Sequence, residues 1–330
     1  EYLAQQSLRT LTNASRRAPY DIKLPLTIYN TSCYRGIPGK YIAAGPLASR
    51  WLQQQFATDA TLARSGAQVL GEPAAGYLSH PGYAALPKAP YRYQEMLGVI
   101  WRENPSCYLE DGEQAVLMAA LMETDNAGRP LIDAWIKRSG LSADAWLEKL
   151  FEATVIPFYH LLCRYGVALI AHGQNVTLVM KDYVPQRILL KDFQGDMRLV
   201  DEDFPQAQSL PEQVKAVTAR LSADYIIHDL QTGNFVTVLR FISRLTLQCG
   251  VSETRFYQIL AGVLRGYMAA HPDLAERFAK FDLFKPQIIR VILNPVKLTF
   301  SEHDGGSRML PNYVTDLDNP LFLASRESAQ

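Results

Sequence analysis

The stretch 171–197 contains the residues whose types and spacing are most indicative of chemistry. A His-Gly turn is followed by Gln174 and Asn175, then by a predicted hairpin, and then by the run from Lys191 to Asp196. In kinase-like folds, a loop Asn and an Asp that follows the next hairpin converge on the metal ions that bridge the phosphates of ATP. The stretch therefore predicts a site for ATP and Mg²⁺.

Each polar residue of this stretch has an expected role. The oxygens of Asn175, Asp192 and Asp196 are the hard donors that Mg²⁺ prefers, and we expect these three residues to hold the metal. We expect Gln174, Asn175 and Lys191 to bind ATP. Taken singly, each residue is more often structural, so it is their combination around one short hairpin that favours a functional interpretation.

The expected reaction type follows from Gln174. Kinases carry a catalytic Asp in this loop, which accepts the proton of a substrate hydroxyl, whereas an amide side chain cannot act as a base. A carboxylate nucleophile needs no base because it is already ionised at neutral pH. The loop therefore favours activation of a carboxylate over phosphorylation of an alcohol.

A second candidate is the turn 30–36, which follows a predicted strand. The hydroxyl groups of Thr31 and Ser32 and the guanidinium of Arg35 could form a phosphate cradle where this strand ends. An ordinary polar turn with a solvated arginine is the alternative. The residues alone leave the two interpretations open.

Other polar residues favour structural roles. His172 could be hydrogen-bonded at a strand end, and Arg102 could form a strand-end salt bridge. The other five histidines are scattered without the spacing of metal ligands, and the four cysteines form no CxxC pair. We therefore expect no zinc site and no disulfide framework, and the simplest interpretation is free thiols in a reducing cytosol.

Periodicity places these residues on an α+β framework. Residues 20–29 alternate as a half-buried strand, with Pro25 at a sheet edge or a bulge. A long helix begins after Ser142, whose hydroxyl can cap it, and ends at Gly166. The remaining pattern predicts a helix at 46–56, a loop at 71–90, a strand at 96–102, a segment of ambiguous type at 114–123, a strand at 167–171, a hairpin of 176–180 and 187–192 around a turn at 181–186, and helices at 221–230, 235–247 and 255–270.

Composition excludes several classes of protein. The 33 basic residues balance the 33 acidic ones, so the basic excess of a nucleic-acid binder is missing. No apolar run reaches the ~18 residues of a membrane span, and no signal peptide is visible. We therefore expect a cytoplasmic protein of about two domains with small-molecule substrates and neither nucleic acid nor membrane as partner.

Several segments closely resemble the IucA/IucC family, the synthetases that make siderophores without a nonribosomal peptide synthetase. The likeness runs over nearly the whole chain. It is carried by KLPLTIYNTSCYRGI (23–37), GEPAAGY (71–77), GVIWREN (98–104), HGQN (172–175) and LLKDFQGD (189–196).

The resemblance implies a hand-like architecture of thumb, fingers and palm. This chain would hold an α+β fingers domain over 1–140 and a kinase-like palm domain over 141–330, with a central β-hairpin or sheet and a helical C-terminal part. The His- and Lys-containing motif of the thumb has no match, and the chain opens at Glu1 without a methionine. The resemblance therefore implies a C-terminal fragment that lacks the thumb domain.

The resemblance also implies roles for residues of the turn 30–36 and of the first helix. The Thr-Ser…Arg motif of the family matches Thr31, Ser32 and Arg35, as contacts to the phosphates or to the citryl carboxylates. The threonine that often follows this arginine is Gly36 here. Arg50 is matched to the citrate side of the site.

In the palm, the His-x-Gln-Asn motif of the family matches His172, Gln174 and Asn175, near the reacting carboxylate and the nucleotide. The acid of the palm, a magnesium ligand, matches Asp192. Many relatives carry a Glu two residues before the histidine, where this chain has Ile170, so one polar role is left unassigned.

The reaction implied by the resemblance uses ATP and Mg²⁺, with His172 and Arg35 as catalytic residues. A citrate-derived carboxylate is adenylated, and an amine such as Nε-acetyl-Nε-hydroxylysine then displaces AMP to form an amide. Two alternatives are a small-molecule kinase built on the same palm and a non-catalytic fragment or partner that retains the fold. The full-length protein could form a homo-oligomer.

Overall fold

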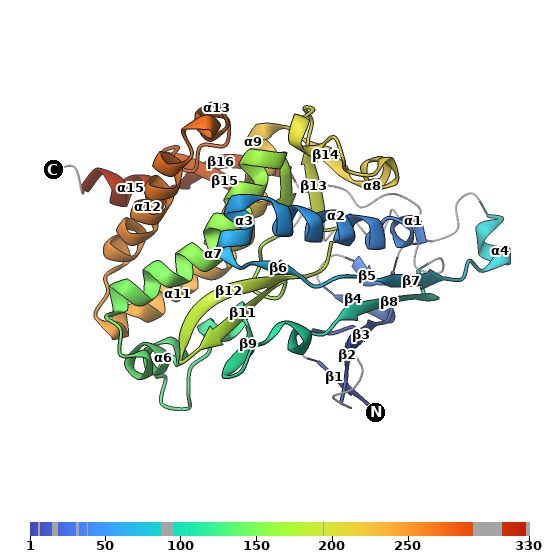
Figure 1. Ribbon diagram of the computed structural model, residues 1–330, viewed down its shortest axis with the longest axis horizontal. Helices are drawn as coiled ribbons and strands as arrows, with labels where there is room; N and C mark the ends of the chain where they lie inside the picture. The colour runs from blue at the N-terminus through green and yellow to red at the C-terminus, as the bar shows by residue number, and fades with distance from the viewer. Residues whose placement is uncertain are drawn as a thin grey trace.

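The computed structural model describes residues 1–5, 7–14, 19–30, 33–37, 39–86, 95–193, 195–292 and 312–327. Within these residues, helices and strands are mixed along the chain, and most of the sheets are small and antiparallel (Figure 1). The predicted α+β class is therefore confirmed.

A five-stranded sheet contains the N-terminal strands. Its order is β1 (Tyr2–Ala4), β2 (Thr10–Asn13), β3 (Tyr20–Lys23), β8 (Gly98–Glu103) and β7 (Ala74–Tyr77). The single strand predicted at 20–29 is wrong, because β3 ends at Lys23 and β4 (Leu26–Asn30) pairs instead with β5 (Cys33–Arg35). Pro25 lies at the break, where its missing N–H cannot serve a ladder.

The predicted hairpin forms the centre of a four-stranded sheet. Its strands β11 (Val176–Lys181) and β12 (Val184–Leu190) are flanked by β9 (Glu113–Leu117) and β6 (Gln68–Val69). The turn is tighter than the predicted 181–186, because only Asp182 and Tyr183 lie between the strands, with φ of 49° and 64°. Two left-handed residues match the right-handed twist of a two-residue hairpin.

Two predicted segments before the hairpin have a different structure. The loop expected at 71–90 contains β7 and the short helix α4 (Pro81–Ala84), while residues 87–90 lie outside the described part of the chain. The ambiguous segment 114–123 divides into β9 and the 3₁₀ helix η2 (Met118–Met122).

Helix α7 (Ala143–Tyr165) is the central element of the core. The Ser142 hydroxyl accepts a hydrogen bond from the Ala145 amide, and Gly166, with φ of 65°, ends the helix, as predicted. Trp146, Phe151 and Tyr159 are fully buried. The helix packs against β12 and α12 (Glu253–Ala270), and α2 (Gly45–Thr58) packs against β6 (Figure 1).

The C-terminal part is helical, as predicted, but its helices are more broken. The single helix expected at 235–247 is wrong: the chain forms a π-helix (η4, Gln231–Leu239), then α11 (Arg240–Leu245), then a 3₁₀ helix (η5, Thr246–Cys249). The predicted helix 221–230 contains the end of β14 (Ala219–Leu221), α9 (Ala223–Ile226) and α10 (His228–Leu230).

The remaining elements lie along the whole described chain. They are α1 (Gly39–Ile42), α3 (Ala60–Ser65), η1 (Pro105–Tyr108), α6 (Leu131–Ser139), β10 (Val167–Leu169), β13 (Met197–Val200), η3 (Pro205–Ala207), α8 (Glu212–Val217), η6 (Pro272–Leu274), α13 (Ala275–Lys280), β15 (Gln287–Ile292), β16 (Asn312–Asp318) and α15 (Pro320–Glu327).

The boundary expected near residue 140 falls between α6 and α7. Strands β6 and β9, which precede it, pair with β12 and β11, which follow it, and one apolar cluster includes residues from both sides. The division into 1–140 and 141–330 stays a prediction. No helix among the described residues has the length and apolarity needed to cross a membrane.

Candidate active site

A polar cavity of about 350 Å³ lies where the N-terminal sheet meets the hairpin. It is formed by the β1–β2 loop, β3, β5, the loop before β11 and the loop after β12. Its lining residues are Ser7, Leu8, Arg9, Thr10, Lys23, Arg35, His172, Gln174, Asn175, Asp192 and Asp196.

Most of the residues predicted from the sequence share this cavity. They come from segments far apart in the chain: Arg35 from β5, His172, Gln174 and Asn175 from the loop before β11, and Asp192 and Asp196 from the loop after β12. Because these side chains line one space, a single ligand of about nucleotide size could contact several of them. Their individual roles stay predictions.

Four other predicted residues are not among those described as lining this cavity. Thr31 and Ser32 lie outside the described residues. Lys191 faces an adjoining cavity, and Arg50 is exposed on α2, where its Nε donates to the Pro46 carbonyl at 3.3 Å. The phosphate contact expected of Lys191 and the citrate contact expected of Arg50 stay predictions.

Buried ion pairs hold the Asp192 carboxylate in place. Lys23 Nζ donates to Asp192 Oδ1, and Arg102 Nη2 donates to the same oxygen at 2.6 Å. Arg102 also donates to Glu72 Oε1 at 2.9 Å, and the side chains of Arg102 and Glu72 are 3% and 1% exposed. The strand-end salt bridge predicted for Arg102 is thus confirmed, and it is part of the cavity's supporting layer.

The charges of this cluster shift its protonation equilibria. Burial alone would raise the pKa of Asp192, but Arg102, Lys23 and Lys191 hold it well below its usual range. Burial lowers the pKa of Lys23, against the opposing charge of Asp192. Asp192 is therefore an anion at neutral pH.

The backbone of Asp192 is in the left-handed region, with φ of 67°. Non-glycine residues adopt this conformation at a cost of order 1–3 kcal/mol, and Asp and Asn tolerate it better than most. Such residues cluster at functional sites, where the surrounding contacts impose the conformation. Here the two basic side chains fix where the carboxylate points.

The loop that carries His172 is held by backbone hydrogen bonds. The Ile170 amide donates to the Asp196 carbonyl at 3.2 Å, and the Ala119 amide donates to the Gly173 carbonyl at 3.1 Å. Asn175 closes the loop, since its Nδ2 donates to the Ile170 carbonyl at 3.2 Å and to Asp196 Oδ2 at 3.3 Å. The loop is therefore fixed relative to Asp196.

The π-helix supports the same loop from behind. Asn234 Nδ2 donates to the Ala171 carbonyl at 3.1 Å, and a Cβ on Gly233 would lie 3.2 Å from the Ala171 nitrogen. Asp229, directly before the π-helix, is 3% exposed, and its Oδ2 has no hydrogen-bond partner among the described residues. Burial raises the pKa of Asp229 to about 6. π-Helices are often found at functional sites, and this one packs against the loop.

The oxygens suited to a metal ion are those of Asp192, Asp196 and Asn175. No cluster of three His, Cys, Asp or Glu residues among the described ones could hold a metal alone. Mg²⁺ is usually bound through one or two carboxylates together with phosphates of the substrate. The donor set therefore fits a Mg²⁺ ion that arrives with a polyphosphate.

Two basic residues of the polar cavity, Arg9 and Lys23, were not predicted from the sequence. Arg9 and Lys23 line the cavity beside Arg35, and Thr10 lies opposite Lys23 in the β2–β3 ladder. A signal was present, because Asp21 and Lys23 alternate with Ile22 and thus place two charges on one face of a strand. The pairing of Lys23 with Asp192, 169 residues away, had no local signal.

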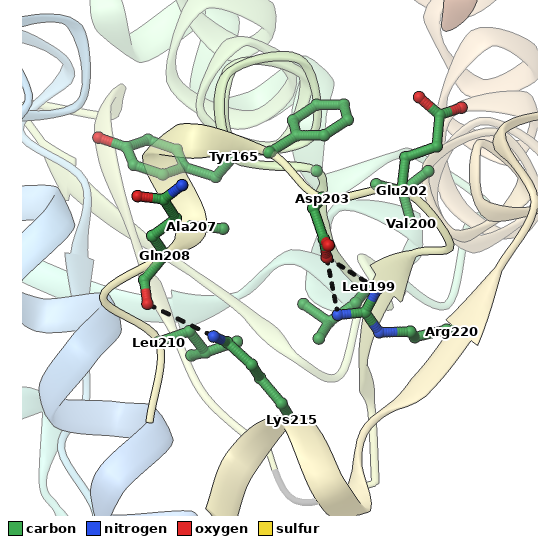
Figure 2. Close-up of a pocket in the computed structure, with 12 residues that line it drawn as sticks. Tyr165, Leu199, Val200, Glu202, Asp203, Ala207, Gln208, Leu210, Lys215 and Arg220 are labelled. Atoms are coloured by element: carbon green, nitrogen blue, oxygen red, sulfur yellow. Dashed lines mark hydrogen bonds and ion pairs between the residues drawn. The ribbon is translucent and has the colours of Figure 1, made fainter. Parts of the chain in front are cut away.

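A third cavity, of about 190 Å³, is lined by none of the predicted site residues. It lies beside the end of α7 and β13, and Figure 2 shows Arg220 turned toward Asp203 and Lys215 turned toward Gln208. Arg220 pairs with Asp203 at 3.2 Å, and Lys215 donates to the Gln208 carbonyl at 3.4 Å. The polar cavity is the better candidate site.

Comparisons with known proteins match this chain to a protein family and to several synthases. Residues 1–123 match the model of the IucA / IucC family, and residues 144–307 match that of the ferric iron reductase FhuF-like transporter. The chain is 72% identical to aerobactin synthase of Escherichia coli, over 99% of this chain and 56% of that protein. The chain thus spans about half the length of the curated relatives it matches.

Two solved structures share the fold. Aerobactin synthetase IucC from a hypervirulent pathotype of Klebsiella pneumoniae superposes with a TM-score of 0.85 at 65% identity, over 98% of this chain and 54% of that one. ATP-bound aerobactin synthetase IucA from the same source superposes with a TM-score of 0.74 at 18% identity, over 97% and 55%. The second likeness concerns the fold alone.

We expect Arg102→Met to destabilise the chain by about 3–5 kcal/mol, because it leaves Asp192 and Glu72 buried without their guanidinium partner. Urea unfolding followed by circular dichroism measures this loss. Arg255→Met, which removes the exposed pair with Asp144, is the matched control and should cost less than about 1 kcal/mol. Equal losses in the two variants would contradict a supporting role for the buried cluster.

We expect Asp229→Asn to flatten the pH dependence of stability between about pH 4 and about pH 6. In this window the native chain retains a proton on Asp229 that the unfolded chain has lost, so stability falls as pH rises. In the variant, the fall in the free energy of unfolding across this window should be smaller by about 2 kcal/mol. Urea unfolding at several pH values in this window measures the free energy of unfolding. Asp224→Asn, at an exposed position of α9, is the control and should keep the pH dependence of the unmodified chain.

Proposed function

The chain belongs to the IucA/IucC family, and we propose that it is the catalytic part of an ATP-dependent siderophore synthetase. It would adenylate a carboxylate of a citrate derivative and join it to an amine through an amide bond. Its similarity to aerobactin synthase favours Nε-acetyl-Nε-hydroxylysine as the amine and a citryl derivative as the carboxylate donor.

One observation carries this proposal. The cavity brings together the oxygens of Asn175, Asp192 and Asp196 and the cations of Arg35 and Lys23. Oxygen donors suit a metal ion, and guanidinium and ammonium groups suit phosphates. A metal-bound triphosphate needs both oxygen donors for the metal and cationic groups for the phosphates. This pairing supports ATP as a substrate.

The nucleophile follows from the same cavity. Gln174 lies in the loop in which kinases carry the base that accepts a hydroxyl proton, and its amide cannot act as a base. The two carboxylates of the cavity have other partners, since Asp192 is held by Lys23 and Arg102 and Asp196 accepts from Asn175. A substrate carboxylate is ionised already and needs no base. This supports carboxylate activation over transfer to an alcohol.

In the first step, a carboxylate oxygen of the donor forms a bond to the α-phosphorus while the bond to the pyrophosphate oxygen breaks. Mg²⁺, when bound, would neutralise charge on the phosphates. Arg35 and His172 both line this space and would stabilise charge that develops on the phosphoryl oxygens. Fixed by their backbone segments, they need little reorganisation during the reaction.

In the second step, the amine nitrogen attacks the acyl carbon of the adenylate, AMP leaves, and the nitrogen loses a proton. The carbon–nitrogen bond of the amide replaces the carbon–oxygen bond to AMP. Asn175 and Asp192 are held by the Ile170 carbonyl and by Arg102, respectively. Their role is to hold the nucleotide in place while the acyl group changes partner.

We expect AMP and pyrophosphate, not ADP, as the products of ATP. Chromatography of a reaction with a citryl monoamide donor and Nε-acetyl-Nε-hydroxylysine separates the two outcomes. Exchange of labelled pyrophosphate into ATP should require the carboxylate donor and not the amine. Formation of ADP would favour the kinase alternative, and binding of ATP without any turnover would favour a non-catalytic role.

We expect Arg35→Met to lower kcat/KM by roughly 30- to 1,000-fold, which corresponds to about 2–4 kcal/mol of transition-state stabilisation. Steady-state measurement of pyrophosphate release gives this ratio. Arg64→Met, at the exposed end of α3, is the control and should leave the rate unchanged. A change in KM alone, with the same kcat, would show that Arg35 serves ground-state binding only.

A further inference from the structure

The His172 imidazole lines the polar cavity without a hydrogen bond of its own. Among the described residues, no group bonds to either ring nitrogen, and the residue is half-buried. The direction in which the ring points is therefore set by the backbone that carries it. In this respect His172 differs from Asp192, whose carboxylate is fixed by the side chains of Lys23 and Arg102.

The peptide group before His172 is held by one side chain. Its oxygen, that of Ala171, accepts from Asn234 Nδ2 at 3.1 Å. Because a peptide group is planar, this bond fixes the plane that contains the His172 nitrogen. The Ala171 amide has only a long contact, 3.5 Å to the Asp229 carbonyl, and the Gly173 carbonyl beyond His172 accepts from a backbone amide. Asn234 is thus the side chain through which the backbone of His172 can be altered.

Asn234 is not explained by stability alone. It is 0% exposed within the π-helix η4, and its Oδ1 has no hydrogen-bond partner among the described residues. Its Nδ2 also contacts the Met118 sulfur at 3.7 Å, which is a weak acceptor. A buried amide oxygen without a partner destabilises the folded chain. One good hydrogen bond, to the loop of His172, is retained here in spite of that cost.

The π-helix brings Asn234 within reach of this loop. A Cβ on Gly233 would lie 3.2 Å from the Ala171 nitrogen and 3.8 Å from the Ile170 side chain, so the missing side chain permits the close approach. π-Helical turns are rare and are often found at functional sites. Gly233 and Asn234 therefore supply, one after the other, the space and the donor that the loop needs.

We propose that Asn234 is a positioning residue. By holding the Ala171 carbonyl, it sets the orientation of the His172 imidazole in the polar cavity and thereby the rate of adenylation. The proposal rests on the proposed function, because it takes His172 as a group that stabilises charge on the phosphoryl oxygens. Asn234 is not among the residues that line the cavity, so it would act through His172.

The test compares Asn234→Leu with a matched variant, Asn319→Leu. Both asparagines are buried, at 0% and 2% exposed. Asn319 donates to the carbonyls of Leu283 and Lys285 at 2.8 and 2.7 Å, and none of these residues lines the polar cavity. Because Asn319 also accepts from the Leu321 amide, Asn319→Leu should lower the unfolding temperature more than Asn234→Leu does. It should nevertheless leave kcat unchanged.

Kinetics separates positioning from binding. In pyrophosphate release with a citryl monoamide donor, we expect Asn234→Leu to lower kcat about tenfold or more, because a displaced His172 loses contacts to the transition state. The KM for ATP should change less than about twofold. In a His172→Ala background, the same substitution should change kcat less than about twofold, since the group that it positions is already missing. Equal losses in the two backgrounds overturn the proposal, because Asn234 would then act on the fold.

A spectroscopic measurement needs no turnover. In a chain labelled with ¹³C-histidine, the nuclear magnetic resonance signal of the His172 ring is assigned by its loss in His172→Ala. We expect Asn234→Leu to shift this signal. The signal of His160, whose ring bonds to Asp59 and Tyr267, should stay in place. An unmoved His172 signal overturns the proposal and leaves the proposed function standing.

Two further cases are decided by the same measurements. Asn234→Ala removes the same donor without adding volume and takes the place of Asn234→Leu if the larger side chain prevents folding. An unmodified chain that releases no pyrophosphate overturns the proposed function, and the histidine signals then confirm or overturn the role of Asn234 by themselves.

Discussion

The interaction on which the rest of the site depends is the buried contact of Arg102 with Asp192 and Glu72. It joins β8, the segment before β7 and the loop after the hairpin, so one guanidinium fixes three parts of the chain. Planar and always charged, a guanidinium can serve two carboxylates at once from fixed directions. Burial makes this arrangement costly to break, and it thereby sets the distance between the N-terminal sheet and the hairpin.

Around this contact, the cavity is lined by two kinds of polar side chain, basic ones and ones that carry acceptor oxygens. The β1–β2 loop, β3 and β5 contribute cations, and the loops on either side of the hairpin contribute oxygens. The π-helix, the short helix η2 and Asp196 restrain the loop that carries His172 through its backbone. Rigid support of this kind lets polar side chains act in a fixed geometry without reorganising for each turnover.

Local features of the fold were predictable from the sequence. The Ser142 cap, the Gly166 terminus and the hairpin after Asn175 each follow from neighbouring residues. Within the site, the loop before β11 and the acids after β12 were found for the same reason, since one short hairpin joins them. Pro25 marked the correct place for an interruption, but only the structure showed that a strand of another sheet begins after it.

What could not be predicted depends on contacts between distant segments. Nothing near Arg102 in the sequence indicates that it meets Glu72 and Asp192, and the π-helix forms where periodicity predicts only a plain helix. Lys191 and Asp192 are an intermediate case. The sequence predicted both at the ATP site, whereas in the structure they line two adjoining cavities.

The pairing of Lys23 with Asp192 has a consequence for biosynthesis of the chain. The two residues lie 169 positions apart, a distance that a ribosome covers in roughly 10–30 s, so the first sheet leaves the tunnel long before its anionic partner exists. During that interval Lys23 keeps its water shell, and the early strands lack the ion pair that later ties them down. The candidate site therefore cannot be completed until Asp192 has left the tunnel.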